Sequence, residues 1–248
     1  MIYFLTGLAL LLCAAGAIAA AWGKTTPARQ LFRVGWLAAL ALFVANAVLA
    51  QAMPFGNMRH VFCFFPLVLL PAAAWVRHRT GSDLTSHFAA AAALALLGAL
   101  CMPLQSAWRQ MPALQSPWFA PHVTSYVLAY GLMAVATIPA LRATAVRPNH
   151  MQVADAIVRL ALPFMTFGLW SGALWADAAW GRYWAWDIKE TWALLTWLIY
   201  LAYLHLPATT SLFSYRKALI LLGFVAILIT FLVVNFLPAT GSLHTYSM

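Results

Sequence analysis

Charged side chains are scarce in this sequence of 248 residues. Lys, Arg, Asp and Glu make up 8% of the chain, five residues are acidic, and 65% of all residues are hydrophobic. A water-soluble globular domain carries about a quarter of its residues as charged side chains, so this class of protein is excluded. The chain is expected to use the lipid bilayer as its main solvent.

Cysteine is also scarce, and its pattern excludes a paired-thiol site. Cys13, Cys63 and Cys101 fall inside or at the edge of separate apolar runs and form no C-x-x-C pair. We expect all three to be small packing residues. The sequence also lacks a phosphate-binding loop, a low-complexity linker and a soluble domain.

Eight long apolar runs make up most of the chain. Each holds about 16 to 22 residues of nearly continuous Leu, Ala, Val and Phe, the length that a helix needs to cross the hydrocarbon layer. A transmembrane barrel would show short alternating segments instead. The runs cover residues 2–22, 35–52, 61–76, 88–104, 123–141, 156–176, 191–207 and 217–237. The fold predicted is all-α, a polytopic transmembrane helical bundle of about eight helices forming a single membrane domain over 1–248.

The first run resembles the core of a signal peptide, but no basic residue precedes Lys24. A signal peptide has a positive segment before its apolar core, so we interpret the run as a retained helix.

The basic residues indicate an orientation, because cytoplasmic loops are enriched in Lys and Arg. Ten follow the odd-numbered runs: Lys24, Arg29, Arg33, Arg77, Arg79, Arg142, Arg147, Arg159, Arg216 and Lys217. Four follow the even-numbered runs: Arg59, Arg109, Arg182 and Lys189. Both termini are therefore predicted to be extracytoplasmic. The basic residues are scattered and form no dense patch, so no nucleic-acid partner is expected.

Two histidines are predicted at the outer face, from segments far apart in the sequence. His122 follows Pro121, which suits the first turn of a helix, and His244 lies seven residues past the last run. Two neutral imidazoles on one side of a membrane suit an axially coordinated haem iron. Unrelated surface histidines would satisfy the same pattern. His60, before the third run on the outer side, is a further histidine whose role stays open.

His205 is predicted to be buried. It lies roughly 20 Å along its helix from the outer end near Thr191, past the middle of the bilayer. An ionisable side chain at that depth is a functional-site hypothesis by default. The alternative is a histidine that caps the inner end of the helix and reaches the headgroups.

A tryptophan-rich collar, residues 177–190, is predicted as an extracytoplasmic loop between the sixth and seventh runs. It holds the aromatic residues Trp180, Tyr183, Trp184 and Trp186 and the acid Asp187. Tryptophan gathers at membrane interfaces without any ligand, and this accounts for two or three of these residues. The density favours a flat apolar macrocycle that packs against indole faces. Arg59, Arg109, Arg182 and Lys189 are candidate partners for its propionates.

Three stretches carry a family resemblance that is specific from about Leu114 onward. "WGRYWAWDIKETWALLTWLIYLAYLH" closely resembles the tryptophan-rich (WWD) signature of haem-handling membrane proteins, above all the CcsA (ResC) subunit family of System II cytochrome c synthases. "LQSPWFAPHVTSYVLAYG" and "VNFLPATGSLHTYSM" resemble the segments with the two external histidines of that family. These map onto His122 and His244, and the transmembrane histidine of the family maps onto His205.

The resemblance implies export of haem b and its covalent attachment to apocytochrome c at the outer face of the bacterial inner membrane. It implies that His122 and His244 hold the outer haem iron above Trp180, Tyr183, Trp184, Trp186 and Asp187. His205 would hold an inner haem iron with a histidine from a CcsB-type membrane subunit. No catalytic residue is implied beyond haem positioning. The implied partners are CcsB, an apocytochrome with a C-x-x-C-H motif, thiol-reducing proteins and the bilayer.

Two other functions stay open. A b-type haem electron-transfer subunit usually holds haem between histidines inside its helices, and only His205 is predicted there. A CcmC-like protein delivers haem to a chaperone, and the eight runs and the Lys189-Glu190-Thr191 continuation argue against it.

Overall fold

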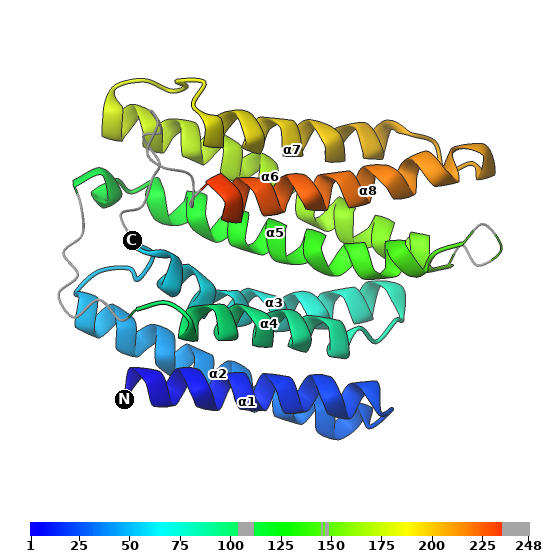
Figure 1. The fold of residues 1–248 in the computed structure, drawn as a ribbon, viewed down its shortest axis with the longest axis horizontal. Coiled ribbons are helices and arrows are strands. Elements are labelled where there is room, and N and C mark those ends of the chain that lie inside the picture. The colour runs from blue at the N-terminus through cyan, green and yellow to red at the C-terminus, as the bar shows by residue number, and fades with distance from the viewer. Residues whose placement is uncertain (104–111, 145, 147–148, 235–248) are drawn as a thin grey trace. The chain divides into compact units, whose positions relative to one another are not determined.

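The computed structural model describes residues 1–103, 112–144, 146 and 149–234. All regular elements in these ranges are helices, and eight of them are long α-helices (Figure 1). The prediction of an all-α polytopic bundle is therefore confirmed. The helices group into two compact units, Met1–Gln115 and Ser116–Met248, which we describe separately. A single membrane domain over 1–248 stays a prediction.

The first unit is a bundle of four helices joined by short connections. The helices are α1 (Ile2–Ala21), α2 (Thr25–Ala50), α3 (Met58–Thr80) and α4 (Thr85–Leu100), followed by the 3-10 turn η1 (Pro112–Gln115). α1 packs against α2 and α4, and α3 packs against α2 and α4. Gly35 lets α2 approach α1, because a Cβ there would lie 2.9 Å from the sulfur of Cys13.

The second unit is a ring of four long helices. They are α5 (Phe119–Arg142), α6 (Asn149–Trp180), α7 (Ile188–His205) and α8 (Phe213–Leu228), with a short 3-10 turn η2 (Thr210–Leu212) before α8 and a π-helical turn η3 (Ile229–Val233) after it. α5 packs against α6 and α8, and α7 packs against the same two helices. The ring therefore closes, with the N-terminal end of α5 beside the C-terminal end of α6.

Several helices extend further than the apolar runs predict. α2 begins at Thr25 and not at 35, so it includes Arg29 and Arg33, and α3 ends at Thr80 and not at 76, so it includes Arg77. Basic side chains are tolerated in the end turns of a membrane helix because their long stems carry the charge to the headgroups. A prediction from hydropathy alone therefore assigns these helical end turns to the neighbouring loops. The predicted collar loop is shorter for the same reason: its first four residues complete α6, and only 181–187 connect α6 to α7.

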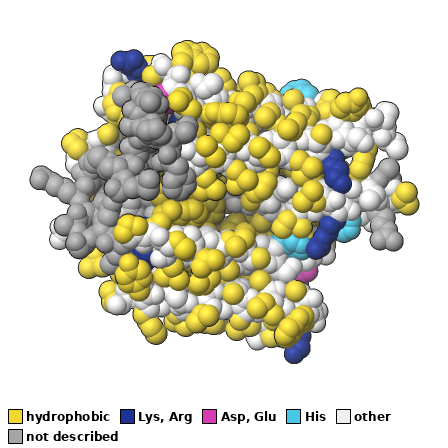
Figure 2. All heavy atoms as spheres, in the orientation of Figure 1, with side chains coloured by type: hydrophobic (Ala, Val, Ile, Leu, Met, Phe, Trp, Pro, Cys, Tyr) yellow, Lys and Arg dark blue, Asp and Glu magenta, His cyan; other side chains and the backbone are white. Residues whose placement is uncertain are grey.

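Six of the described helices are long and apolar enough to cross a bilayer. These are α1, α2, α3, α5, α6 and the segment Thr210–Val233. α4 is shorter at 16 residues, and α7 opens with Lys189 and Glu190. Figure 2 shows hydrophobic side chains over most of the visible helix surface, and Phe4 and Leu11 are 70% and 69% exposed. A surface of this kind is stable in lipid and would associate in water. The chain is a multi-pass membrane protein.

The cysteines are free, as expected for residues without a paired-thiol site. Cys13 and Cys63 are buried packing residues, which confirms the prediction for both. Cys101 is exposed at the C-terminal end of α4, so the same prediction is wrong for this residue.

Candidate functional site

His122 lies in the first turn of α5 and is fixed there by contacts with α6. Its Nδ1 lies 2.8 Å from the backbone oxygen of Gly168. Its ring stacks on Trp175, with centroids 5.4 Å apart and planes 29° from parallel, and meets the edge of Tyr126 at 5.1 Å. These contacts hold the imidazole in one orientation at the end of the second unit.

The hydrogen bond to Gly168 decides which ring nitrogen carries the proton. A carbonyl oxygen can only accept, so Nδ1 is the donor. In a neutral imidazole the lone pair then resides on Nε2, the atom that binds a metal ion. Histidines that bind metals usually donate their other N–H to such a carbonyl, which sets both the tautomer and the ring orientation. His122 has the orienting contact of a metal ligand.

Two glycines of α6 make room for the α5 side chains. A Cβ at Gly172 would lie 2.5 Å from Nδ1 of His122, and a Cβ at Gly168 would lie 2.9 Å from the ring of Tyr126. Glycines four residues apart occupy one face of a helix and let another membrane helix approach closely. This spacing is visible in the sequence as "GLWSG", but our sequence interpretation did not use it.

Aromatic side chains extend the site from His122 toward the collar. Trp175 is buried and contacts Phe119 at 5.1 Å and Trp180 at 5.0 Å, measured between ring centroids. Trp180 is the last residue of α6, so the structure links one predicted collar residue to His122 through Trp175. Trp175 and Phe119 are site residues that the sequence-based candidate set omits.

The remaining collar aromatics lie on the 181–187 turn. Trp184 and Trp186 contact each other edge to face at 5.8 Å. Trp186 and Tyr183 expose 70% and 57% of their surface. The indole nitrogen of Trp184 is buried and has no hydrogen-bond partner among the described residues. A buried N–H without an acceptor is costly, so this donor suits a ligand that brings an oxygen atom.

Asp187 and Glu190 shape this turn. The carboxylate of Asp187 accepts a hydrogen bond of 2.7 Å from the Glu190 backbone N–H, and Glu190 accepts bonds from the N–H groups of Ala185 and Asp187. This reciprocal pair is a capping box at the start of α7. Trp186, just before it, has φ +58°, a left-handed conformation that costs about 1–2 kcal/mol for a residue other than glycine. The hydrogen bonds of Asp187 and Glu190 therefore hold the backbone on either side of Trp186 while Trp186 itself is in this left-handed conformation.

His205 is the last residue of α7, and its side chain is exposed. This exposure concerns the surface of the chain itself, so the predicted depth of His205 in the bilayer stays a prediction. The helix ends there instead of continuing to 207, so the ring leaves the bundle at the helix end. Nδ1 of His205 lies 2.8 Å from the Leu201 backbone oxygen, which again assigns the proton to Nδ1.

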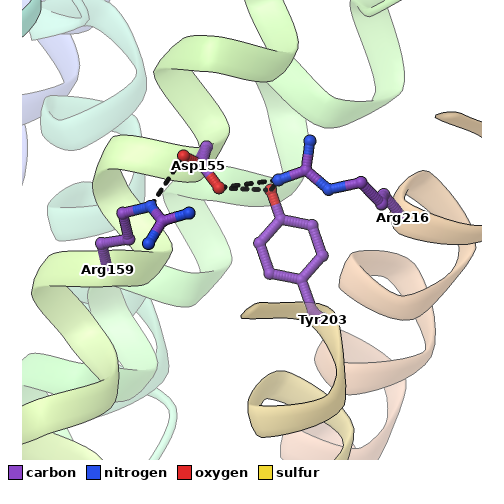
Figure 3. Close-up of polar contacts among 4 residues, drawn as sticks. All are labelled: Asp155, Arg159, Tyr203 and Arg216. Carbon is purple, nitrogen blue, oxygen red and sulfur yellow. Dashed lines mark hydrogen bonds and ion pairs between the residues drawn. The ribbon is translucent and has the colours of Figure 1, made fainter. Parts of the chain in front are cut away.

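A polar cluster anchors the helix that carries His205 (Figure 3), and its members Tyr203 and Arg216 are buried. The carboxylate of Asp155 on α6 contacts Arg216 of α8 at 2.8 Å, Arg159 at 2.8 Å and the hydroxyl of Tyr203 on α7 at 3.2 Å. The Arg216 guanidinium also lies 4.8 Å from the centre of the Tyr203 ring. Tyr203 is two residues before His205, so the cluster fixes the end of α7 against two other helices.

The other candidate residues lie elsewhere. Arg59 in the first unit is buried and donates to the backbone oxygens of Ala99 and Met102 at the end of α4, which is a structural role. Arg182 is exposed on the collar turn, and Lys189 is half-buried in the first turn of α7. Arg109 and His244 lie outside the described residues, so the pairing of His122 with His244 stays a prediction.

The fold and the site together define a class of protein: a multi-pass helical membrane protein with an oriented histidine enclosed by aromatic rings at one end of its second unit. The family described as "Cytochrome C assembly protein" matches residues 4–241. The chain belongs to this family, as the resemblance of its tryptophan-rich stretch predicts.

Three relatives of this chain share one protein name. The chain is 30% identical over 231 residues to the "Cytochrome c biogenesis protein CcsA" of Guillardia theta, covering 78% of this chain and 76% of that protein. It is 30% identical over 284 residues to the protein of the same name from Synechococcus sp. (strain JA-3-3Ab), covering 83% and 81%. Against that of Chlamydomonas reinhardtii it is 37% identical over 158 residues, covering 58% of this chain and 44% of the relative.

Proposed function

We propose that the chain holds haem b at the outer face of the membrane and presents it for covalent attachment to apocytochrome c, as the CcsA-type subunit of a cytochrome c synthase. Family membership and the names of the relatives support a role in cytochrome c maturation. The observation that carries the haem assignment is the oriented His122, stacked on Trp175 with its Nδ1–H committed to the Gly168 carbonyl.

The proposed outer site joins His122 to the collar and to His244. His122 and His244 would supply the two axial nitrogens, and Trp180, Tyr183, Trp184 and Trp186 would pack against the macrocycle. Indoles offer large apolar faces with one polar edge, which suits a flat ring with polar groups only at its rim. The buried N–H of Trp184 fits a propionate oxygen, and Asp187 keeps the turn in shape.

The chemistry of attachment requires little of this chain beyond positioning. Each thioether forms when a cysteine S–H of a C-x-x-C-H motif adds across a haem vinyl group: the sulfur bonds to one vinyl carbon and the proton ends on the other. No electrons are gained or lost in this addition. The acceptor thiols must arrive reduced, which implies thiol-reducing partners. Rigid side chains that hold the vinyl groups in one place lower the entropic part of the barrier.

We propose a second, inner haem contact at His205, completed by a histidine of a CcsB-type subunit. Its exposure at the end of α7 supports this, because a ligand shared between two chains has to lie on the surface of each. The charge asymmetry of the loops supports an outer collar and an inner His205. In a bacterium the membrane would be the cytoplasmic one.

The test uses cells that lack the gene. We expect all covalent c-type cytochromes to disappear from haem-stained denaturing gels and to return with the wild-type gene. Intact c-type cytochromes with failed respiration would instead support an electron-transfer subunit. Haem that co-purifies with the chain, measured as the pyridine haemochrome, should rise when a CcsB-type partner is co-expressed, and equal loading would contradict a shared inner site.

A further inference from the structure

The first unit contains a cavity of about 240 Å³ between α2, α3 and the start of α4. Most of the side chains that line it are apolar, and three are arginines. Six of the lining residues determine the charge and the apolar character of the cavity: Arg29, Phe32, Arg33, Trp36, Leu70 and Arg77. The cavity lies wholly within one unit and contains none of the proposed haem ligands.

The lining changes from charged to apolar along the helices. Arg29 and Arg77 lie in the end turns of α2 and α3, which are antiparallel neighbours joined by a short loop. Trp36 lies seven residues beyond Arg29, or about 10 Å further along the helix. The cavity therefore has a cationic end at the level of the headgroups and an apolar end at the level of the acyl chains.

The apolar end is rigid because of a proline. Pro71 has no N–H to donate to the carbonyl of Leu67, four residues earlier in α3. The indole Nε1 of Trp36 on α2 donates to that oxygen instead, at 3.0 Å. The bond fixes the Trp36 ring as one wall of the cavity and satisfies a carbonyl that lipid cannot satisfy.

The cationic end of the cavity has three arginines and one nearby carboxylate, so its net charge is positive. Arg29 lies 3.8 Å from Asp83 in the α3–α4 loop. Burial raises the pKa of Asp83, but hydrogen bonds from Thr85 and the charges of Arg29 and Arg77 outweigh it and lower the pKa, so this carboxylate is charged at neutral pH. Arg33 and Arg77 make no side-chain hydrogen bond or ion pair within the described part of the chain.

We propose that this cavity binds an anionic phospholipid, with its phosphate between Arg33 and Arg77 and an acyl chain against Trp36 and Leu70. Guanidinium groups bind phosphate oxygens in pairs. Basic pockets between transmembrane helices are typical sites for anionic headgroups, and the loop charges assign this end of the unit to the cytoplasmic leaflet. A free phosphate ion would use the arginines but leave the apolar end of the cavity unexplained.

Native mass spectrometry of the purified full chain in detergent tests this. Titration with dioleoylphosphatidylglycerol should produce a saturable one-lipid adduct, dioleoylphosphatidylcholine should bind at least tenfold more weakly, and millimolar inorganic phosphate should not displace the bound lipid. Equal binding of the two lipids would overturn the proposal. Displacement by phosphate alone would reassign the arginines to a free anion and overturn it too.

Matched variants locate the site. The double variant R33Q/R77Q should lose at least tenfold in phosphatidylglycerol affinity, whereas R79Q/R142Q, which removes the same charge from exposed positions outside the cavity, should bind as the wild type does. Ala74→Phe, which fills the cavity without changing charge, should also weaken binding. If R33Q/R77Q does not fold, a photoreactive phosphatidylglycerol on the wild-type chain decides: label on 29–36 and 70–77 supports the site, and label only elsewhere refutes it.

Discussion

The imidazole of His122 and the backbone oxygen of Gly168 are 46 residues apart in the sequence and 2.8 Å apart in space. This contact joins the start of α5 to α6 and places the imidazole proton on Nδ1. It requires a close approach of the two helices, which the glycine face of α6 permits. The position of His122, the proposed haem ligand, therefore depends on glycines, which have no side chain.

Gly172→Ala should disturb the site without touching a ligand. The added Cβ would lie 2.5 Å from Nδ1 of His122, so the ring or the α5 backbone has to move. Overpacking of this kind costs about 1–3 kcal/mol. We expect co-purified haem to fall to the level of a His122 variant, as measured by the pyridine haemochrome.

Gly7→Ala is the matched control, because a Cβ at Gly7 meets nothing within 4 Å. The change should leave haem content unaltered, and stability should stay equal or rise by up to about 1 kcal/mol through helix propensity. If both alanine variants keep the wild-type haem content, the close approach of α6 is not what positions His122.

Glu190 is predicted to maintain the shape of the collar turn. Its carboxylate accepts hydrogen bonds from the backbone N–H groups of Ala185 and Asp187. Glu190→Ala removes both acceptors at a cost of about 1–3 kcal/mol, and Trp186 should leave its left-handed conformation. Haem content and cytochrome c yield should both fall.

Glu190→Gln separates shape from charge at the same position. The amide oxygen can still accept both hydrogen bonds, so this variant should retain most of the haem and most of the cytochrome c yield. Equal losses in the alanine and glutamine variants would indicate that the negative charge matters, and would refute the purely structural role.

Asp155→Asn should destabilise the end of the second unit that carries His205. The change leaves the guanidinium of Arg216 buried without its counter-charge, which costs about 3–5 kcal/mol. Arg159→Gln removes a partner whose side chain is 58% exposed and should cost less than about 1 kcal/mol. Thermal unfolding of both variants in the same detergent measures the difference, and similar midpoints would contradict the anchoring role of Asp155.

The helices could be predicted from the sequence because bilayer thickness sets their length, and each of the eight predicted runs overlaps a long helix in the described part of the chain. Their ends could not, since Arg29, Arg33 and Arg77 belong to helical end turns that hydropathy assigns to loops. The collar aromatics and His122 were found by their density and their place after Pro121.

The parts that sequence reasoning missed depend on tertiary contacts. Gly168 and Gly172 matter only because α5 lies against them, and Phe119 matters because it packs on Trp175, which stacks on His122. Asp187 was selected as a haem-site residue, yet its visible contacts cap a helix. His205 was predicted to lie deep in the bilayer by counting residues along its helix; the structure shows that α7 ends at this residue and that its ring lies on the surface of the chain.

The central claim is that Nε2 of His122 is an axial ligand of haem, and it is tested most directly by the optical spectrum of purified His122→Gly with and without added imidazole. The glycine variant should lose its haem or hold it in an altered coordination state, and imidazole should restore the wild-type reduced spectrum and part of the cytochrome c yield by filling the vacant position. A variant whose spectrum and yield match the wild type without imidazole would contradict the assignment.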